Sequence, residues 1–159
     1  SLRPNLQVAA KQSAASRAAQ QPNPEAPLAR WVAERPDDRQ GRAMLGEAYL
    51  LAGRNAPAIE QYERLAASPT AGYAVLNNLA WLYQQTGDDR AEATARRAYD
   101  LAPGDPAVLD TYGWILVSKG KVAEGLPLLA KAAELAPDNP DIRRHHAEAV
   151  EMAGQKGSD

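Results

Sequence analysis

Residues 106–139 read PAVLDTYGWILVSKGKVAEGLPLLAKAAELAPDN, and this stretch decides the fold. Apolar residues recur at helical spacing on both sides of a short polar segment, Ser-Lys-Gly-Lys, at 118–121. Gly120 favours a tight turn between two helices, and Pro137 ends the second helix because proline cannot continue one. The stretch therefore predicts a helical hairpin.

The same plan recurs along the chain with a period of about 34 residues. Three kinds of marker keep this period. Turn glycines fall 34, 33 and 34 residues apart, at Gly53, Gly87, Gly120 and Gly154. Small residues earlier in each unit have the same spacing, at Gly46, Ala80, Gly113 and Ala147. Prolines that close the second helices stand at Pro36, Pro69, Pro103 and Pro137. Such agreement predicts an all-α protein of stacked repeats.

The composition agrees with helices that pack closely. Hydrophobic residues make up 45% of the 159 residues, yet phenylalanine is absent and alanine is abundant. The net charge of −2 gives no electrostatic footprint for nucleic acid or an anionic membrane. The absence of cysteine excludes disulfides, thiol catalysis and thiolate metal sites. No apolar run approaches the ~18 residues of a membrane span, and we expect no membrane contact by this chain itself.

We expect one solenoid domain over residues 1–159. Its predicted parts are a degenerate hairpin at 1–38, three complete units at 39–72, 73–105 and 106–139, a capping helix at 140–154 and a tail at 155–159. The start at Ser1, with no methionine and no signal peptide, indicates an excised or processed fragment. An open N-terminal face would favour self-association.

The two ends of the chain carry the weakest pattern. A first helix is predicted from Pro4 to Gln20, with disorder of the first few residues as the alternative. A second helix begins at about Glu25 and places Leu28, Trp31 and Val32 on one face. In the capping helix Ile142, Ala147 and Val150 are expected to face the stack, and His145 to point outward.

The period and the residue types resemble the tetratricopeptide repeat (TPR) family. This resemblance implies a right-handed superhelix of stacked hairpins. The phrases LNNLAWLY at 76–83, AYDLAP at 98–103 and LDTYGWIL at 109–116 resemble a narrower group. That group is the TPR lipoproteins that accompany PEP-CTERM/exosortase systems and exopolysaccharide loci of Gram-negative bacteria. It implies a periplasmic place in the cell envelope, with a lipoprotein cysteine that is not in this chain.

No motif in the sequence predicts catalysis. Phosphate-binding loops, GxSxG and HExxH are absent. His145 and His146 are neighbours, so on a helix they point about 100° apart and do not bind one metal from one face. Asp88 and Asp89 are interpreted as a helix N-cap. We therefore expect no enzyme activity, no cofactor and no metal site.

Binding is the function that the TPR resemblance implies. In this family the first helix of each unit lines a concave groove. The residues at groove positions that we predict to bind a partner are Asn77, Asn78, Trp81, Gln84, Asp110, Trp114 and Arg144. Gln84 is the last of these positions in its helix, and Arg144 is the only residue placed to form a carboxylate clamp, so a receptor for chaperone tails is disfavoured.

Trp81 and Trp114 are equivalent residues, 33 positions apart. Either both are partly buried against the next helix, or both form an aromatic platform. A platform would suit a peptide side chain or a sugar ring. Two functions remain open at this point: a scaffold that holds a protein or peptide, and a module that binds an oligosaccharide.

Overall fold

The computed structural model describes residues 4–18 and 23–156. These residues form nine α-helices and no strand, which confirms the all-α prediction. The chain divides into two compact units, 1–71 and 72–159, and each is described by itself. The division falls within one residue of the predicted repeat boundary, whereas a single solenoid domain over the whole chain stays a prediction.

The first unit contains four helices. They are α1 (Pro4–Ala18), α2 (Ala26–Glu34), α3 (Arg39–Leu51) and α4 (Asn55–Ala66). The pair α1 and α2 occupies the predicted degenerate hairpin, and α3 and α4 form the first complete repeat, predicted at 39–72. The predicted disorder of the first few residues and the extension of the first helix to Gln20 lie outside the described residues.

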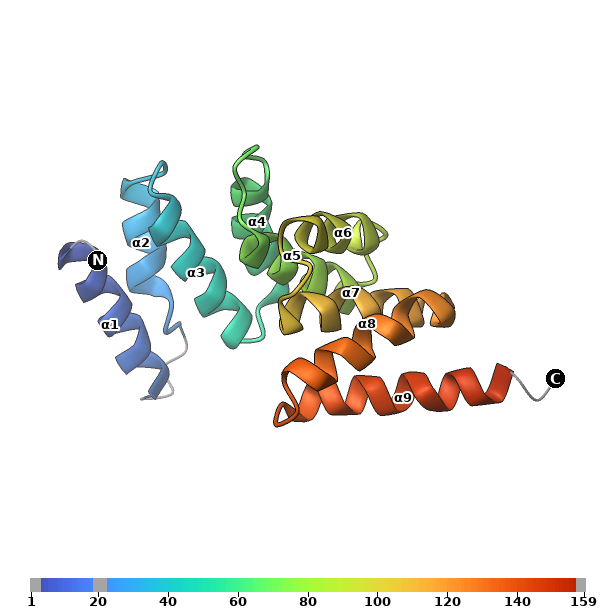
Figure 1. Cartoon of the computed structure of the whole chain (residues 1–159). Helices are drawn as coiled ribbons and strands as arrows, with labels where there is room; N and C mark the ends of the chain where they lie inside the picture. The colour runs from blue at the N-terminus through green and yellow to red at the C-terminus, as the bar shows by residue number, and fades with distance from the viewer. Residues whose placement is uncertain (1–3, 19–22, 157–159) are drawn as a thin grey trace. The chain divides into compact units, whose positions relative to one another are not determined.

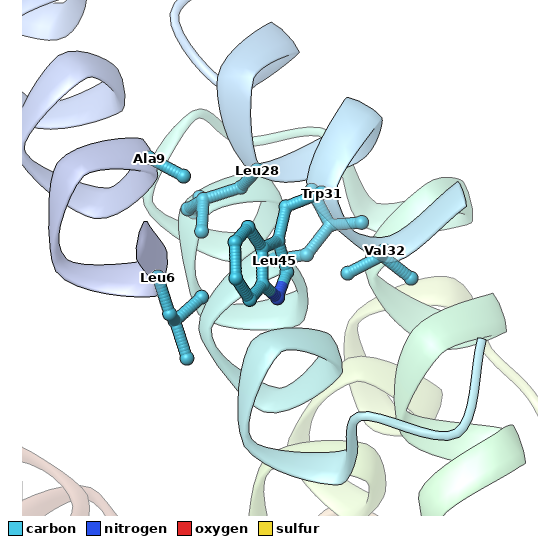
Figure 2. Close-up of a cluster of buried hydrophobic side chains, with 7 residues drawn as sticks. Leu6, Ala9, Leu28, Trp31, Val32 and Leu45 are labelled. Carbon is cyan, nitrogen blue, oxygen red and sulfur yellow. The ribbon is translucent and has the colours of Figure 1, made fainter. Parts of the chain in front are cut away.

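The core of the first unit lies between α1, α2 and α3. Figure 2 shows the Trp31 ring among aliphatic side chains from these helices, including Leu6, Leu28 and Leu45. The predicted buried face of α2 is confirmed, since Leu28, Trp31 and Val32 are 3%, 8% and 6% exposed. The indole Nε1 of Trp31 donates to Asp38 Oδ2 at 2.9 Å, so this buried ring keeps its hydrogen bond.

The second unit contains five helices. They are α5 (Tyr73–Thr86), α6 (Ala91–Leu101), α7 (Pro106–Ser118), α8 (Val122–Leu135) and α9 (Pro140–Lys156). The pairs α5–α6 and α7–α8 are the hairpins predicted at 73–105 and 106–139. Helix α7 packs against α5, α8 and α9, and α8 also packs against α9 (Figure 1). Within this part of the chain, α7 therefore lies beside the first helices of the preceding and the following repeat, α5 and α9.

The turns between paired helices depend on glycine. Gly53, Gly87 and Gly120 have φ of 69°, 71° and 80°, the left-handed region that other residues rarely adopt. The prediction of a fourth turn at Gly154 is wrong. Gly154 lies inside α9 and does not end the helix. Helix α9 also extends through the start of the predicted tail to Lys156, and residues 157–159 lie outside the described ranges.

Side-chain caps fix where α7 and α9 begin. Each cap stands two residues after a proline that closed the preceding helix. Asp105 Oδ1 accepts hydrogen bonds of 2.9 and 3.1 Å from the first amides of α7. Asn139 Oδ1 accepts bonds of 3.0 and 3.2 Å from those of α9. Amides at a helix start lack partners within the helix, so these caps stabilise both starts.

The predicted N-cap at Asp88 and Asp89 is wrong. Arg90 holds the cap position of α6, and no side chain caps it. Asp88 instead accepts from the backbone N–H of Arg90 at 2.9 Å and from its guanidinium at 2.7 and 3.0 Å. The hydrogen bond from the Arg90 side chain is the main cause that lowers the pKa of Asp88 to about 2. Asp88 therefore closes the turn before α6.

Two glycines allow the backbones of α7 and α8 to touch. A Cβ on Gly125 would lie 2.4 Å from the carbonyl oxygen of Gly113 and 2.7 Å from Val117 Cγ2. A Cβ on Gly113 would lie 2.9 Å from Leu129 Cγ. Real Cβ atoms do not approach a carbonyl oxygen as closely as 2.4 Å, so position 125 requires glycine, whereas a Cβ at Gly113 would force Leu129 to shift. Gly113, one of the small residues that keep the repeat period, therefore admits the paired helix.

The predicted inward face of α9 is partly wrong. Ile142 is buried as expected, but Ala147 is exposed and Val150 is 48% exposed. Ala149 faces the stack instead and is fully buried. Ile142 and Ala149 are seven residues apart, which keeps them on one side of a helix. Ala147 matches Gly113 by position, but in the described residues no paired helix covers that side of α9.

We predict that Gly125→Ala destabilises the protein by about 1–3 kcal/mol, because its Cβ forces α7 and α8 apart. Chemical denaturation measures this change in the free energy of unfolding. Gly104→Ala is the matched control, since a Cβ there meets no atom within 4 Å and its φ is not positive. Equal stabilities of the two variants would contradict the close approach.

Candidate functional site

The second unit has a hollow of about 370 Å³ between α5, α7 and α9. Its lining comes mainly from the first helices of three successive repeats, as the TPR resemblance implies. The lining residues are Trp81 and Gln85 of α5, Ala107, Asp110, Thr111 and Trp114 of α7, Asn139, and Asp141, Ile142, Arg144 and His145 of α9.

Helical periodicity explains why these residues meet. The α7 residues stand at relative positions 0, 3, 4 and 7 from Ala107, which share one face of a helix. Asp141, Arg144 and His145 repeat the same spacing in α9. Trp81 and Gln85 are four residues apart and also share a face.

Trp114 forms part of the packing of the unit. Its ring is partly buried and packs against a cluster that contains Val117, Leu129 and Ala149. It also stacks on the imidazole of His145, with ring centroids 4.5 Å apart and an interplanar angle of 14°. Trp114 therefore joins α7 to α8 and α9. Trp114 is therefore partly buried against neighbouring helices, which is the first of the two alternatives given for the tryptophans.

His145 is held at both ring nitrogens. Nδ1 lies 2.9 Å from both carboxylate oxygens of Asp110, and Nε2 lies 3.2 Å from Arg144 Nη2. A guanidinium only donates, so Nε2 accepts and the proton sits on Nδ1, which donates to Asp110. The side chains of His145 and Asp110 are 12% and 13% exposed. The expectation that His145 points outward into solvent is wrong, because Trp114 and Asp110 offer it a stacking face and an acceptor.

Arg144 is held by carboxylates of its own helix. Its guanidinium lies 3.4 Å from Asp141 Oδ1 and 3.4 Å from Glu148 Oε1. The hydrogen bond to Asp141 is the largest cause that raises the pKa of Arg144, and Glu148 adds to it. Its charge is thus balanced within α9.

Trp81 differs from the other tryptophans in its exposure. It is 40% exposed, whereas Trp31 in the first unit is 8% exposed. A large, partly exposed indole in a concave lining is the kind of group that anchors a binding partner. Trp81 and Trp114 are equivalent in sequence but not in environment.

The structure brings together four of the seven predicted site residues: Trp81, Asp110, Trp114 and Arg144 line the hollow. Asn77, Asn78 and Gln84 are not among its lining residues, and Gln85 takes the place expected for Gln84. Asn77 Oδ1 is buried without a hydrogen-bond partner in this structure. A role of any of these residues in binding stays a prediction.

Seven lining residues are outside the predicted set: Gln85, Ala107, Thr111, Asn139, Asp141, Ile142 and His145. The i to i+4 neighbour of Trp81 is the signal that would have found Gln85. Asn139 follows the proline that ends α8, and its side chain caps α9.

Within residues 4–18 and 23–156, no group of three or more His, Cys, Asp or Glu side chains is arranged to hold a metal ion. None of the helices there is both long and apolar enough to cross a membrane.

We predict that Asp110→Ala and His145→Ala are coupled by about 0.5–1.5 kcal/mol in a double-mutant cycle of unfolding free energies. The reason is that each single change leaves a largely buried polar group without its partner. The exposed pair Arg96 and Asp100, with side chains 64% and 60% exposed, is the matched control and should couple by only about 0.3–0.5 kcal/mol. A coupling at Asp110 and His145 no larger than this would refute their structural role.

The chain resembles proteins of known sequence over part of its length. No family model matches it. The photosystem I assembly protein Ycf3 of Synechococcus sp. (strain WH7803) is 37% identical over 76 residues, which are 45% of this chain and 44% of that protein. The match therefore spans less than half the length of that relative.

Solved structures resemble almost the whole chain in fold. A crystal structure of MamA has a TM-score of 0.78 at 15% identity, over 97% of this chain and 85% of that one. YrrB, described as a TPR protein with an unusual peptide-binding site, has a TM-score of 0.73 at 15% identity, over 95% of this chain and 77% of that one. The chain thus has the all-α fold of stacked TPR hairpins.

Proposed function

We propose that this protein is a non-enzymatic TPR scaffold that binds a segment of a partner protein in the hollow between α5, α7 and α9. The observation that carries the proposal is the exposed indole of Trp81 in a concave lining whose other aromatic residue, Trp114, is held in place. A volume of about 370 Å³ is at the low end for binding pockets, which suits a few side chains of a longer segment.

The wall opposite α5 is preorganised. Asp110 and Trp114 hold His145, and His145 accepts a hydrogen bond from Arg144. A wall with its side chains already fixed loses little conformational freedom on binding, so more of the contact energy appears as affinity. Trp81 then supplies the apolar contact area, and the polar side chains of Gln85 and Asn139 can bond to a peptide backbone.

The hydrogen bonds of His145 argue against catalysis. An aspartate and a histidine also occur together in catalytic triads, where the second imidazole nitrogen takes a proton from a nucleophile. Here that nitrogen faces the guanidinium of Arg144 at 3.2 Å, and the ring is stacked on Trp114. The lone pair that a general base would use is already engaged.

The names of similar proteins support a scaffold. Ycf3 is named as an assembly protein, and YrrB is described as having a peptide-binding site. An oligosaccharide module built on two tryptophan platforms has less support, because His145 covers a face of Trp114. Sugar recognition would rest on Trp81 alone.

We predict that a photo-cross-linking amino acid placed at Gln85 captures a protein in extracts of producing cells. Gln85 is exposed and lines the hollow, and its replacement leaves Trp81 intact. Adding Trp81→Ala should reduce the adduct by roughly tenfold or more, as expected when a binding hot spot is removed. Mass spectrometry identifies the partner and quantifies the adduct.

The matched control carries the cross-linker at Leu101, which is 58% exposed and lies outside the hollow. Adducts of equal yield at both positions, or an adduct at Gln85 that survives Trp81→Ala, would exclude this binding site. An adduct that resists protease and contains sugar would favour the oligosaccharide module. An adduct between two copies of the chain would indicate self-association.

We further propose that the scaffold serves a PEP-CTERM or exopolysaccharide export system in a bacterial cell envelope. The support is the resemblance of residues 76–83, 98–103 and 109–116 to the TPR lipoproteins of such systems. In that setting the scaffold would hold a protein of the export or sorting machinery.

We predict that the native protein, expressed from its own gene, is recovered in the envelope fraction and is digested by protease when the outer membrane alone is permeabilised. A periplasmic position would make it accessible in this way. Immunoblotting of the fractions, with a cytoplasmic enzyme as the control, measures the result. Recovery in the cytoplasmic fraction with full protease resistance would contradict an envelope role.

A further inference from the structure

The charges around the hollow favour a cationic ligand. The lining contains two carboxylates, Asp110 and Asp141, and one guanidinium, Arg144. The imidazole of His145 lies between Asp110 and Arg144, with Nδ1 2.9 Å from the Asp110 carboxylate and Nε2 3.2 Å from Arg144 Nη2. Glu148 lies next to Arg144 and increases the negative excess. A concave lining with one sign of charge in excess attracts a partner of the opposite sign.

Arg144 is poorly placed to receive a carboxylate. Its Nη1 is directed at Glu148, and its Nη2 is shared between Asp141 and His145. An incoming anion would have to displace these partners and would meet the charges of Asp141 and Asp110. Arg144, the one residue that the sequence places for a carboxylate clamp, is therefore unsuited to that role.

The start of α9 is not open to an anion either. A helix N-terminus attracts anions through its unpaired amides. Asn139 already caps the first amides of α9, and Asp141 places a carboxylate in its first turn. The guanidinium of Arg144 and the first amides of α9 usually attract a negative group. Both are already hydrogen-bonded to other groups of this chain.

Trp81 supplies a surface that favours a cation. The face of an indole carries negative electrostatic potential and attracts ammonium and guanidinium groups. The structure contains an example in the first unit, where the guanidinium of Arg35 lies 3.9 Å from the centroid of the Trp31 ring. Trp81 is 40% exposed, and the side chain of Asp141, which lines the same hollow, is 75% exposed.

We propose that the partner segment inserts a lysine or arginine side chain into the hollow, over the indole of Trp81 and balanced by Asp141. The proposal rests on the function inferred above and adds the chemistry that selects the partner. Asp141 and Trp81 act as specificity-determining residues. Asp110 holds His145 and contributes only to the surrounding charge.

A peptide-library selection on the full chain tests this inference. Random dodecapeptides displayed on phage are selected in parallel on the unchanged protein and on Asp141→Asn, Asp141→Lys and Trp81→Ala. Asp138→Asn is the matched control, because it removes the same charge from an exposed residue outside the hollow. Circular dichroism melts confirm that every variant folds before selection.

We expect peptides selected on the unchanged protein and on Asp138→Asn to be enriched in lysine or arginine at one position. Replacing that residue by glutamate in a synthetic peptide should weaken binding by about tenfold or more. Asp141→Asn should reduce the basic preference, Asp141→Lys should shift it toward acidic peptides, and Trp81→Ala should abolish enrichment.

Two results would overturn the inference, and they differ in what else they exclude. Neutral or acidic peptides whose enrichment still depends on Trp81 would leave peptide binding in place and refute the cationic selection. Enrichment that is absent, or unchanged by Trp81→Ala, would refute the cationic selection. The cross-link at Gln85 then decides whether the binding site fails as well, since an adduct that depends on Trp81 would retain it.

Discussion

The contact between Gly113 and Gly125 is the constraint on which the second unit depends. It lets the backbones of α7 and α8 touch, because neither residue carries a Cβ that would meet the opposite helix. Leu129 fits against Gly113 and belongs to the same cluster as Ala149 of α9. One close approach therefore sets the position of α8 on α7, and α8 in turn positions α9. The hollow lies between α5, α7 and α9, which supply its lining.

The two tryptophans that are equivalent in sequence have different environments in the hollow. Trp114 is held by His145 and by the core, so its ring contributes shape and rigidity. Trp81 has no such ring partner in the described residues and keeps 40% of its surface exposed. Rigid surroundings around one exposed aromatic residue are typical of a binding hot spot. We propose that the charges of Asp141, Glu148 and Arg144 select the ligands that approach this residue.

Much of this architecture could be predicted from the sequence, because each complete repeat carries the same glycine and proline markers. The period, the turn glycines at 53, 87 and 120, and the hairpin boundaries depend on local rules of glycine and proline, and these hold in every complete unit. The same rules failed at Gly154 and Ala147. Gly154 matches a turn glycine and Ala147 matches a small packing residue of a complete repeat. The described residues contain no second helix of that repeat, so neither residue meets the helix that its position implies.

The site was harder to predict, because it depends on pairs that are distant in sequence. Position within a repeat brought Trp81, Asp110, Trp114 and Arg144 to one hollow, but it also selected Gln84, Asn77 and Asn78, which line no part of it. The bond between Asp110 and His145 joins residues 35 positions apart, and no local pattern indicates it. The pattern of α9 alone predicts that His145 is solvated, whereas its side chain is largely buried and joins α9 to α7.

Oxidative footprinting of the tryptophans tests the central claim most directly. The full chain is exposed to hydroxyl radicals with and without its bound partner, and oxidation at each indole is measured by mass spectrometry. The account predicts that binding strongly protects Trp81 and leaves the 8%-exposed Trp31 unchanged. A partner that binds while Trp81 is oxidised at its free rate would contradict the account.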